Sequence, residues 1–223
     1  MEQLADNRSP PAWEGRATGG GTAASSPCWS CRGPVGDADY AFCSTCGAVQ
    51  PPLPITHFQR LGLASGFQIP RDQLDAAYFD QARRLHPDRF ATRTPRERQF
   101  SQAQAVSLNE AYETLKDPLR CALYLLTLAG RSSIAQERTI RDPTLLMEAM
   151  EAREALEEAT DLAAVEALAA RQRADRDSCL ASLQQLFDAG DLDGAEAVTL
   201  RLTYLAKLGE DIRLRRMRLA MSA

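Results

Sequence analysis

Four of the six cysteines lie close together in the chain, with a spacing that suits a metal site. They form two C-x2-C pairs separated by eleven residues: Cys28 and Cys31, then Cys43 and Cys46. Each pair can fold as a tight turn that points two thiolates at one metal ion, and the nearby Gly33 and Gly47 tolerate the positive φ that such turns need. Four thiolates in a tetrahedral arrangement favour structural Zn2+, and a closed site of this kind leaves no position for catalysis.

Two other interpretations of these cysteines are weaker. A redox-active C-x-x-C motif is disfavoured because no βαβ pattern surrounds it. An iron–sulfur site is the second alternative, since thiolates also bind iron. Cys121 and Cys179 stand alone in helical surroundings, where a cysteine behaves as a small apolar residue. The clustered spacing therefore predicts metal binding in a reducing compartment rather than disulfides.

His86 and Asp88, two residues apart, form the second group whose chemistry matters. They are candidates for an acid–base pair, but the chain has no phosphate loop, dinucleotide fingerprint or nucleophile elbow. Pro87 ends the preceding helix and fixes a turn that projects Asp88. Three arginines flank this turn: Arg83, Arg84 and Arg89. A rigid acid beside a basic surface favours charge-guided docking to a partner, so no enzymatic activity is expected.

The composition predicts a soluble protein with an ordinary core. Of the 223 residues, 44% are hydrophobic and 25% are charged, and the net charge is −4. The resulting negative field repels polyphosphates and anionic lipids, so neither nucleic acid nor a membrane is an expected partner. No apolar run approaches the roughly 20 residues of a transmembrane helix.

The first residues of the chain predict a disordered lead-in. They are rich in glycine, serine, proline and alanine and lack the apolar middle of a secretory signal. Glu2, Asp6 and Glu14 fit poorly with a mitochondrial transit peptide. The predicted location is therefore the cytoplasm, with the mitochondrial matrix as the alternative.

Apolar periodicity predicts a mainly α fold, with a small zinc-ribbon-like β element around the cysteines. The predicted helices are 55–63, about 70–85, 95–116, 119–129, 142–158, 161–188 and 192–218. The two long helices that flank His86 must lie antiparallel, and the last three form a bundle with short connections. The expected domains are a lead-in at 1–27, a four-cysteine head at 28–50, a proline-rich linker at 51–54, a helical domain at 55–130, a linker at 131–141 and a three-helix bundle at 142–219.

The His86-Pro87-Asp88 turn between antiparallel helices resembles a DnaJ-type J domain. The matching residues extend well beyond the turn. They are Tyr78 and Leu85, Arg89-Phe90, the run Asn-Glu-Ala-Tyr-Glu-Thr-Leu at 109–115, Asp117-Pro118 and Arg120. Many members have lysine where this chain has Arg89, and the charge is kept. The resemblance implies that 55–130 is a J domain.

Residues further along the chain are similar to HscB, the iron–sulfur J-type co-chaperone. The similarity lies in residues 120–130 and 139–154 and in Tyr204-Leu205, and the whole match spans about 28–219. No glycine/phenylalanine-rich segment follows the J domain, which fits a specialist. The four-cysteine head occurs in the mitochondrial form of the family and is absent from many bacterial members, so the chain resembles a zinc-headed variant.

The resemblance implies a co-chaperone that stimulates the ATPase of a DnaK/HscA-like chaperone and delivers the iron–sulfur scaffold protein IscU to it. His86, Pro87 and Asp88 would contact the chaperone, with Arg83, Arg84 and Arg89 steering the encounter. The bundle would bind the scaffold through Leu146, Met147, Met150, Glu151, Glu154 and Tyr204. The first five share one helix face, as an apolar stripe rimmed by carboxylates.

Three alternatives stay open. Leu146 and Met150 can instead be core residues, because a helical stripe is more often packing than a binding surface. The chain can also be a zinc-ribbon adaptor, or a general J-domain protein without an iron–sulfur role. A homodimer is compatible with the sequence as well.

Overall fold

The computed structural model describes residues 27–35, 39–131 and 143–221. These residues divide into two compact units, 27–121 and 122–221, which are taken in turn. Apart from Pro27 and Arg131, the lead-in predicted at 1–27 and the linker predicted at 131–141 fall outside the described residues. The mainly α fold class is confirmed by the helices described below.

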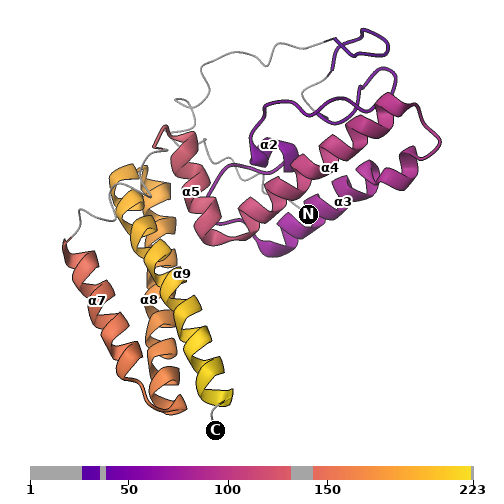
Figure 1. Cartoon of the computed structure of the whole chain (residues 1–223). Coiled ribbons are helices and arrows are strands. Elements are labelled where there is room, and N and C mark those ends of the chain that lie inside the picture. Colours follow the sequence, from indigo (N-terminus) through magenta and orange to yellow (C-terminus); the bar gives the residue numbers. More distant parts are fainter. Residues whose placement is uncertain (1–26, 36–38, 132–142, 222–223) are drawn as a thin grey trace, which may run out of the picture. The chain divides into compact units, whose positions relative to one another are not determined.

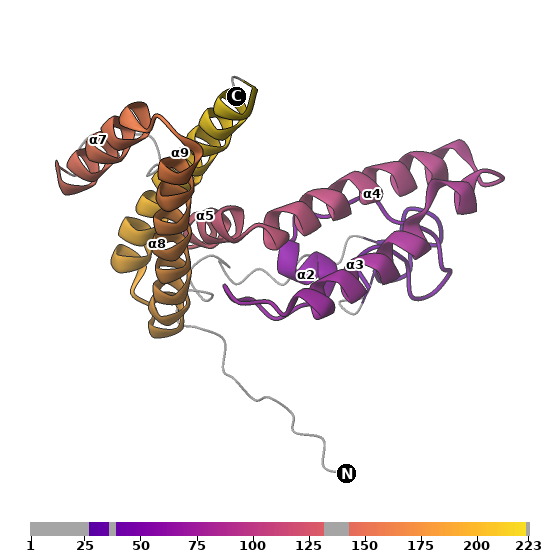
Figure 2. The same ribbon diagram turned by 90° about the horizontal axis from the view of Figure 1, so that it is seen from below.

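An antiparallel pair of long helices dominates the first unit. Helices α3 (Arg71–Leu85) and α4 (Pro95–Lys116) lie side by side, joined through the short 3-10 helix η1 (Pro87–Phe90) (Figures 1 and 2). Helix α3 ends at Leu85 because His86, which precedes a proline, has extended backbone with ψ 129°. Helix α4 begins with a capping box, in which the Thr94 side chain accepts from the Glu97 N–H and the Glu97 side chain accepts from the Thr94 N–H.

The short helix α2 (His57–Leu61) packs against α4. It is shorter than the predicted helix at 55–63 because a capping box at Thr56 sets its start and Gly62, with φ 66°, sets its end. Phe58 and Leu61 point inward as their spacing indicates, and are 0% and 4% exposed. Together with the buried apolar residues of α3 and α4, they form the core of this unit.

The second unit is a helical bundle. Helix α5 (Pro118–Leu128) begins in the first unit and ends in the second, and α7 (Pro143–Glu158), α8 (Leu162–Ala189) and α9 (Leu192–Met221) follow. Helices α8 and α9 share the most extensive contact, whereas α7 touches both of them more sparingly. The residues that fill the space between α8 and α9 are fully or almost fully buried: Val165, Leu183, Phe187, Leu202, Leu205 and Ile212.

The helix ends of the bundle follow the local signals in the sequence. Asp161 caps α8 by accepting from the Ala164 N–H at 2.8 Å. Asp191 accepts from the Gly194 N–H at 2.9 Å at the start of α9. Gly190, with φ 71°, ends α8. Acceptor side chains at helix starts and a left-handed glycine at a helix end are the expected capping residues, so the sequence itself sets these boundaries.

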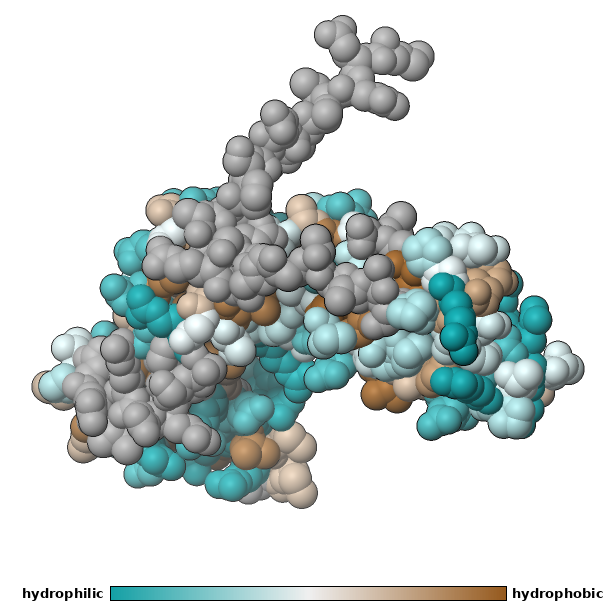
Figure 3. Space-filling view, turned by 90° about the horizontal axis from the view of Figure 1, so that it is seen from above, coloured by the Kyte–Doolittle hydropathy of each residue, from teal (hydrophilic) through white to brown (hydrophobic). Residues whose placement is uncertain are grey.

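The predicted β element is a single antiparallel bridge between Phe42 and Val49, and the described residues contain no strand. Residues 36–38, between the two cysteine pairs, lie outside the described ranges. None of the described helices is long and apolar enough to cross a membrane. The face seen in Figure 3 is mainly hydrophilic and carries separate small apolar patches.

Candidate functional site

The four cysteines of the head converge on one point. Their sulfur atoms all lie within 4.8 Å of one another. The Sγ–Sγ distance is 3.7 Å between Cys28 and Cys46, and also between Cys31 and Cys43. A tetrahedral zinc site with Zn–S bonds of about 2.3 Å has sulfur–sulfur edges of about 3.8 Å, so these sulfurs fit a zinc ion with little rearrangement.

Two backbone turns hold the cysteine pairs. The Arg32 N–H donates to the Cys28 carbonyl at 2.8 Å, and the Gly47 N–H donates to the Cys43 carbonyl at 2.9 Å. Arg32 has φ 60° and Gly47 has φ 71°, so the positive φ of the first turn falls on Arg32 and not on Gly33 as predicted. Gly33 is constrained by space instead, because a Cβ there would lie 2.9 Å from the Thr45 hydroxyl oxygen.

The thiols of the cluster ionise unequally. Burial of Cys28 acts to raise its pKa, but hydrogen bonds from the backbone of Cys31 and Ser30 and from the neighbouring thiols lower that pKa to about 6. Backbone hydrogen bonds likewise lower the pKa of Cys43. The Gly33 N–H acts to lower the pKa of Cys31, but the neighbouring sulfurs and burial raise it to about 12. Four thiolates at these distances would need a bound cation to compensate their charge, and the four sulfurs lie close enough together to hold a metal ion in that role.

The turn that carries the second candidate group is exposed. We call His86, Pro87 and Asp88 the docking tip. The side chains of His86 and Asp88 are 59% and 90% exposed. The Asp88 N–H donates to His86 Nδ1 at 3.3 Å, and the Arg89 N–H donates to the His86 carbonyl at 3.0 Å, so the turn is held locally. An acid and a histidine this open to water form a presented surface rather than an enclosed acid–base site.

The three arginines near the docking tip do not share one environment. Arg83 is exposed and pairs with Asp80 at 3.4 Å. Arg89 is also exposed and donates to the Arg83 carbonyl at 3.5 Å. Arg84, by contrast, is half-buried against the cysteine head, where it forms an ion pair with Asp39 and lies 4.7 Å from the centre of the Phe42 ring. Of the three predicted steering residues, only Arg83 and Arg89 therefore present their charge to solvent.

The residues that carried the J-domain resemblance hold the hairpin together. Tyr78 donates to Asn109 Oδ1 at 2.8 Å, and the Tyr78 and Tyr112 rings stack with centroids 4.1 Å apart. Tyr112 donates to Asp75 Oδ1 at 2.9 Å, and Arg71 pairs with the same oxygen at 2.9 Å. The hydrogen bond to Asp75, with burial, raises the pKa of Tyr112, and the hydrogen bonds from Tyr112 and Arg71 lower the pKa of Asp75. These residues position the docking tip from its base.

The predicted scaffold-binding stripe on α7 is exposed. We call its five residues the α7 face: Leu146, Met147, Met150, Glu151 and Glu154. The first three are 50%, 62% and 56% exposed. Leu145 and Leu156 face the bundle instead and are 6% and 8% exposed. The alternative that Leu146 and Met150 are core residues is therefore wrong.

Tyr204 of α9 contacts α7 next to the α7 face. Its hydroxyl donates to the Ala149 carbonyl at 3.1 Å, and burial raises its pKa. Tyr204 and Glu151 border a cavity of about 160 Å3 between α7, α8 and α9. Arg201 and Glu148 form an ion pair at 3.1 Å beside it. The structure thus joins Tyr204 to one edge of the α7 face.

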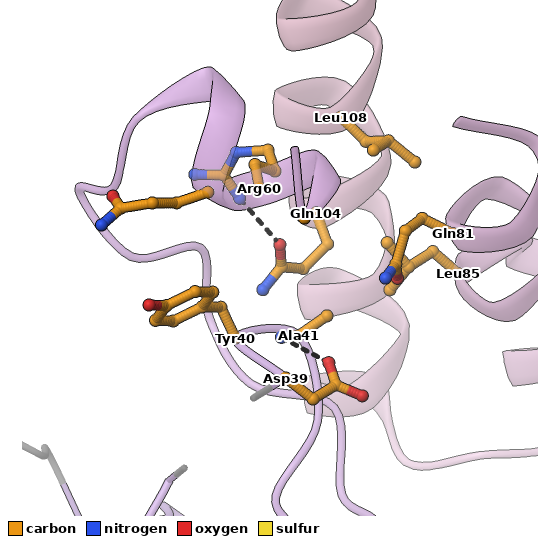
Figure 4. A pocket seen from close by; sticks show the side chains of 10 residues that line it. Asp39, Tyr40, Ala41, Arg60, Gln81, Leu85, Gln104 and Leu108 are labelled. Carbon is orange, nitrogen blue, oxygen red and sulfur yellow. Dashed lines mark hydrogen bonds between the residues drawn. The ribbon is translucent and has the colours of Figure 1, made fainter. Parts of the chain in front are cut away.

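A second cavity lies where the cysteine head meets the J-domain helices. It measures about 220 Å3 and is lined by Asp39, Tyr40 and Ala41 on one side and by α2, α3 and α4 on the other (Figure 4). Arg60 and Gln104, which face it, hydrogen-bond to each other at 3.1 Å. Gln104 also donates to the Gln50 carbonyl at 3.0 Å. Since these polar groups are satisfied within the protein, the cavity shows no arrangement that suits catalysis.

Sequence reasoning missed Asp39, Gln50, Gln104 and Trp29 as residues that connect the head to the J domain. Asp39 and Arg84 are 45 residues apart, and Gln50 and Gln104 are 54 apart. No local pattern links such pairs. A glutamine in the middle of an amphipathic helix was the one available signal, because Gln104 occupies a position that the helical period places inside.

Known proteins resemble this chain in both of its units. A family described as "HSCB C-terminal oligomerisation domain" matches residues 141–213. An iron-sulfur cluster co-chaperone protein HscB homolog from Arabidopsis thaliana is 32% identical over 186 residues, which cover 83% of this chain and 72% of that protein. A co-chaperone protein HscB homolog from Burkholderia mallei is 36% identical over 160 residues, or 70% of this chain and 91% of that protein.

The similarity extends to three dimensions. The crystal structure of human co-chaperone protein HscB superposes with a TM-score of 0.81 at 31% sequence identity. The superposition covers 86% of this chain and 99% of the human one.

Proposed function

The chain belongs to the HscB family of iron–sulfur co-chaperones, and from this premise we propose that it stimulates the ATPase of a DnaK/HscA-like chaperone and delivers an IscU-like scaffold protein to it. The chain itself would carry out no reaction. The observation that carries the proposal is the coexistence of two exposed surfaces of different chemistry, the docking tip on one unit and the α7 face on the other.

The docking tip supports the chaperone half of the proposal. Asp88 is held on a short 3-10 helix with its carboxylate in solvent, and Arg83 and Arg89 lie beside it. A fixed acid with basic neighbours matches a partner surface of alternating charge, and such complementarity sets orientation and the rate of encounter. Because the tip is rigid before docking, little conformational entropy is lost on binding.

The chaperone half is tested by the ATPase rate of a purified DnaK-type protein. We expect the wild-type chain to hydrolyse no ATP alone and to accelerate hydrolysis by the chaperone. His86→Gln and Asp88→Asn should abolish the acceleration without lowering the melting temperature, because both side chains are exposed. Asp72→Asn, an exposed acid at the other end of α3, is the control and should behave as the wild type. Full acceleration by both tip variants would contradict the proposal.

The α7 face supports the scaffold half. Three adjacent apolar side chains, each at least half exposed, are rimmed by Glu151 and Glu154. Burial of exposed leucine and methionine side chains is the usual source of binding energy at the centre of an interface, while carboxylates at the rim select a basic partner surface. This combination fits a folded protein partner of moderate size.

The scaffold half is tested by titrating an IscU-type protein into the purified chain. The double variant Leu146→Ala, Met147→Ala should lose about 2 kcal/mol of binding free energy, or roughly 30-fold in Kd. The matched control is Leu214→Ala, Met217→Ala, which removes apolar side chains that are 46% and 55% exposed on α9. Equal loss of affinity in both double variants would contradict a site on α7. If the chain binds a DnaK-type protein but no scaffold, the conclusion would be that it is a general J-domain protein without an iron–sulfur role.

The metal is proposed to be structural Zn2+, held by Cys28, Cys31, Cys43 and Cys46. The all-thiolate donor set and the sulfur–sulfur distances of 3.7 Å support it, and iron is the alternative. Metal analysis of the purified chain, with cobalt substitution to count sulfur ligands, decides between them. The cytoplasmic location stays a prediction.

A further inference from the structure

The cysteine head contacts both helices that carry the docking tip, close to the tip itself. On the α3 side, Asp39 pairs with Arg84, which stands two residues before His86, and the Phe42 ring lies 4.7 Å from the same guanidinium. This contact connects the last turn of α3 to the cysteine head. Asp39 and Arg84 are 28% and 37% exposed, so the pair is partly shielded from water.

On the α4 side, the contact is made by Trp29, the residue that follows the first metal ligand. Its ring meets the Phe100 ring edge-on with centroids 5.8 Å apart, and the Arg96 guanidinium lies 4.7 Å from its centre. The indole N–H donates to the Val49 carbonyl at 2.7 Å, which fixes the ring within the head. The next residue of α4, Ser101, is fully buried and donates to the Leu85 carbonyl at 2.8 Å. The first turns of α4 are thereby linked to the end of α3.

A series of hydrogen bonds through two buried glutamines joins Cys28 to α4 and α2. The Gln50 side chain donates to Cys28 Sγ at 3.3 Å, and the Gln50 carbonyl accepts from Gln104 of α4 at 3.0 Å. Gln104 in turn accepts from Arg60 of α2 at 3.1 Å. Gln50 and Gln104 are 3% and 2% exposed, and leaving a polar group buried without its partner is strongly unfavourable. Gln50 therefore links the ligand candidate Cys28 directly to α4.

We propose that the metal-loaded cysteine head positions the docking tip, with Trp29, Asp39 and Gln50 as positioning residues that act through α3 and α4. The inference rests on the proposed chaperone function for its consequence and on the contacts above for its structural part. The head holds the two helix ends that flank residues 86–90 at a fixed separation. Loss of the metal would free both ends and weaken chaperone docking, although no residue of the docking tip is altered.

Charge masking is the competing effect. Asp39 neutralises Arg84, so the head also removes one positive charge from the surface beside the tip. A partly exposed ion pair contributes little to stability and is screened by salt. The aromatic contact and the buried hydrogen bonds are several interactions of comparable size that all act in the same direction. Positioning therefore outweighs masking.

The experiment compares metal-loaded and chelator-treated wild type with three variants of the full chain. Trp29→Ala removes the contact with α4, and Asp39→Asn removes the masking charge while keeping a hydrogen-bond acceptor. Ser44→Ala is the control, because this exposed head residue bonds within the head, to the Pro34 carbonyl. Two quantities are measured: amide hydrogen exchange in residues 84–100, and the concentration of chain that half-saturates the ATPase of a DnaK-type chaperone.

We expect exchange in residues 84–100 to rise roughly threefold to tenfold in Trp29→Ala, in line with loss of one aromatic contact, and by a larger factor on metal removal, which releases every contact of the head. The half-saturating concentration should rise in the same order, while the maximal ATPase rate of Trp29→Ala is retained. Ser44→Ala and helices α8 and α9 should not change. Asp39→Asn should raise the half-saturating concentration by a smaller factor than Trp29→Ala, because it weakens only the partly exposed pair with Arg84.

Three results would overturn the proposal. The first is unchanged exchange in 84–100 after metal removal. The second is faster exchange with an unchanged half-saturating concentration. The third is a lower half-saturating concentration in Asp39→Asn, which would make the head a mask for Arg84. If the wild type stimulates no DnaK-type ATPase, the proposed function fails, whereas the exchange data still decide whether the head positions the tip.

Discussion

Under the proposed function, the docking tip and the α7 face would bind their partners in opposite ways, one through charge and the other through apolar area. At the tip, local backbone hydrogen bonds hold the turn that carries the Asp88 carboxylate, which is 90% exposed, and the exposed Arg83 and Arg89 lie nearby in the chain. On α7, Leu146, Met147 and Met150 offer apolar area on a helix that packs sparingly against its neighbours. Charge favours fast, orientation-specific encounter, whereas apolar area favours a long-lived complex. On the proposed function, one chain would hold a cargo protein while it meets a second partner briefly.

The largest expected effect tests whether the metal stabilises only the unit that carries the docking tip. Structural zinc sites in peptides contribute on the order of 10 kcal/mol of folding free energy. Removal of the metal by a chelator should therefore lower the free energy of unfolding of residues 27–121 by several kcal/mol and leave the bundle unchanged. Calorimetry of the full chain measures this as a shift of one transition. If the unfolding transitions of both units shift together, the prediction that the metal stabilises only the first unit is wrong.

A smaller effect tests how α7 is held. Tyr204→Phe keeps the ring and removes the hydrogen bond to the Ala149 carbonyl, which should cost about 1 kcal/mol. Because α7 has few other contacts, we expect roughly fivefold faster hydrogen exchange within residues 143–158, with little change in α8. Uniformly faster exchange across the bundle would show instead that α7 is integral to the core. Tyr78→Phe in α3 is the control, because it removes a tyrosine hydroxyl and its hydrogen bond to Asn109 in the first unit and should leave exchange in residues 143–158 unchanged.

A third prediction separates charge from apolar area directly. Raising salt from low to high concentration should weaken chaperone docking and leave scaffold binding almost unaffected, because salt screens exposed charges. The double variant Arg83→Ala, Arg89→Ala should lower the association rate constant with the chaperone at low salt. We expect the free-energy barrier to association to rise by about 0.5–1 kcal/mol for each charge removed. At high salt the variant and the wild type should converge. Salt-independent docking would place the energy of the tip in apolar contacts.

The smallest expected effect concerns pH and the base of the hairpin. The hydrogen bonds from Tyr112 and Arg71 lower the pKa of Asp75, so the ionised carboxylate stabilises the folded state. This stability is complete above the ordinary aspartate pKa of about 3.9 and is lost as pH falls through the lower pKa of the folded state. Asp75→Asn should flatten the acid limb of the stability curve for the first unit only. Chemical denaturation at several pH values measures this, with Asp72→Asn as the control.

Much of the fold could be predicted because its signals are local. Helix ends coincide with Thr94-Pro95, with Asp161 and with Gly190, each of which acts on its own backbone. The cysteine site was also predictable, since C-x2-C spacing brings two sulfurs together within one turn. The docking tip followed from Pro87, whose effect is confined to its immediate neighbours.

The rest could not be predicted because it depends on contacts across the chain. Arg84 looked like part of an exposed basic patch, and only the folded head reveals that Asp39 takes its charge. The left-handed backbone at Arg32 contradicts the preference for glycine, and the cysteine turn imposes it. In both places a long-range constraint overrides what the local sequence favours.

The hydrogen bond between Gln104 and the Gln50 carbonyl has a consequence for the order of folding during synthesis. The two residues are 54 positions apart, with the head first. At a translation rate of about 5–20 residues per second, roughly 3–11 seconds separate their emergence. The head can bind its metal during this interval, but it has no α4 to rest on. Loading of the metal is thus expected to precede docking, so the finished head acts as a template against which the two hairpin helices close.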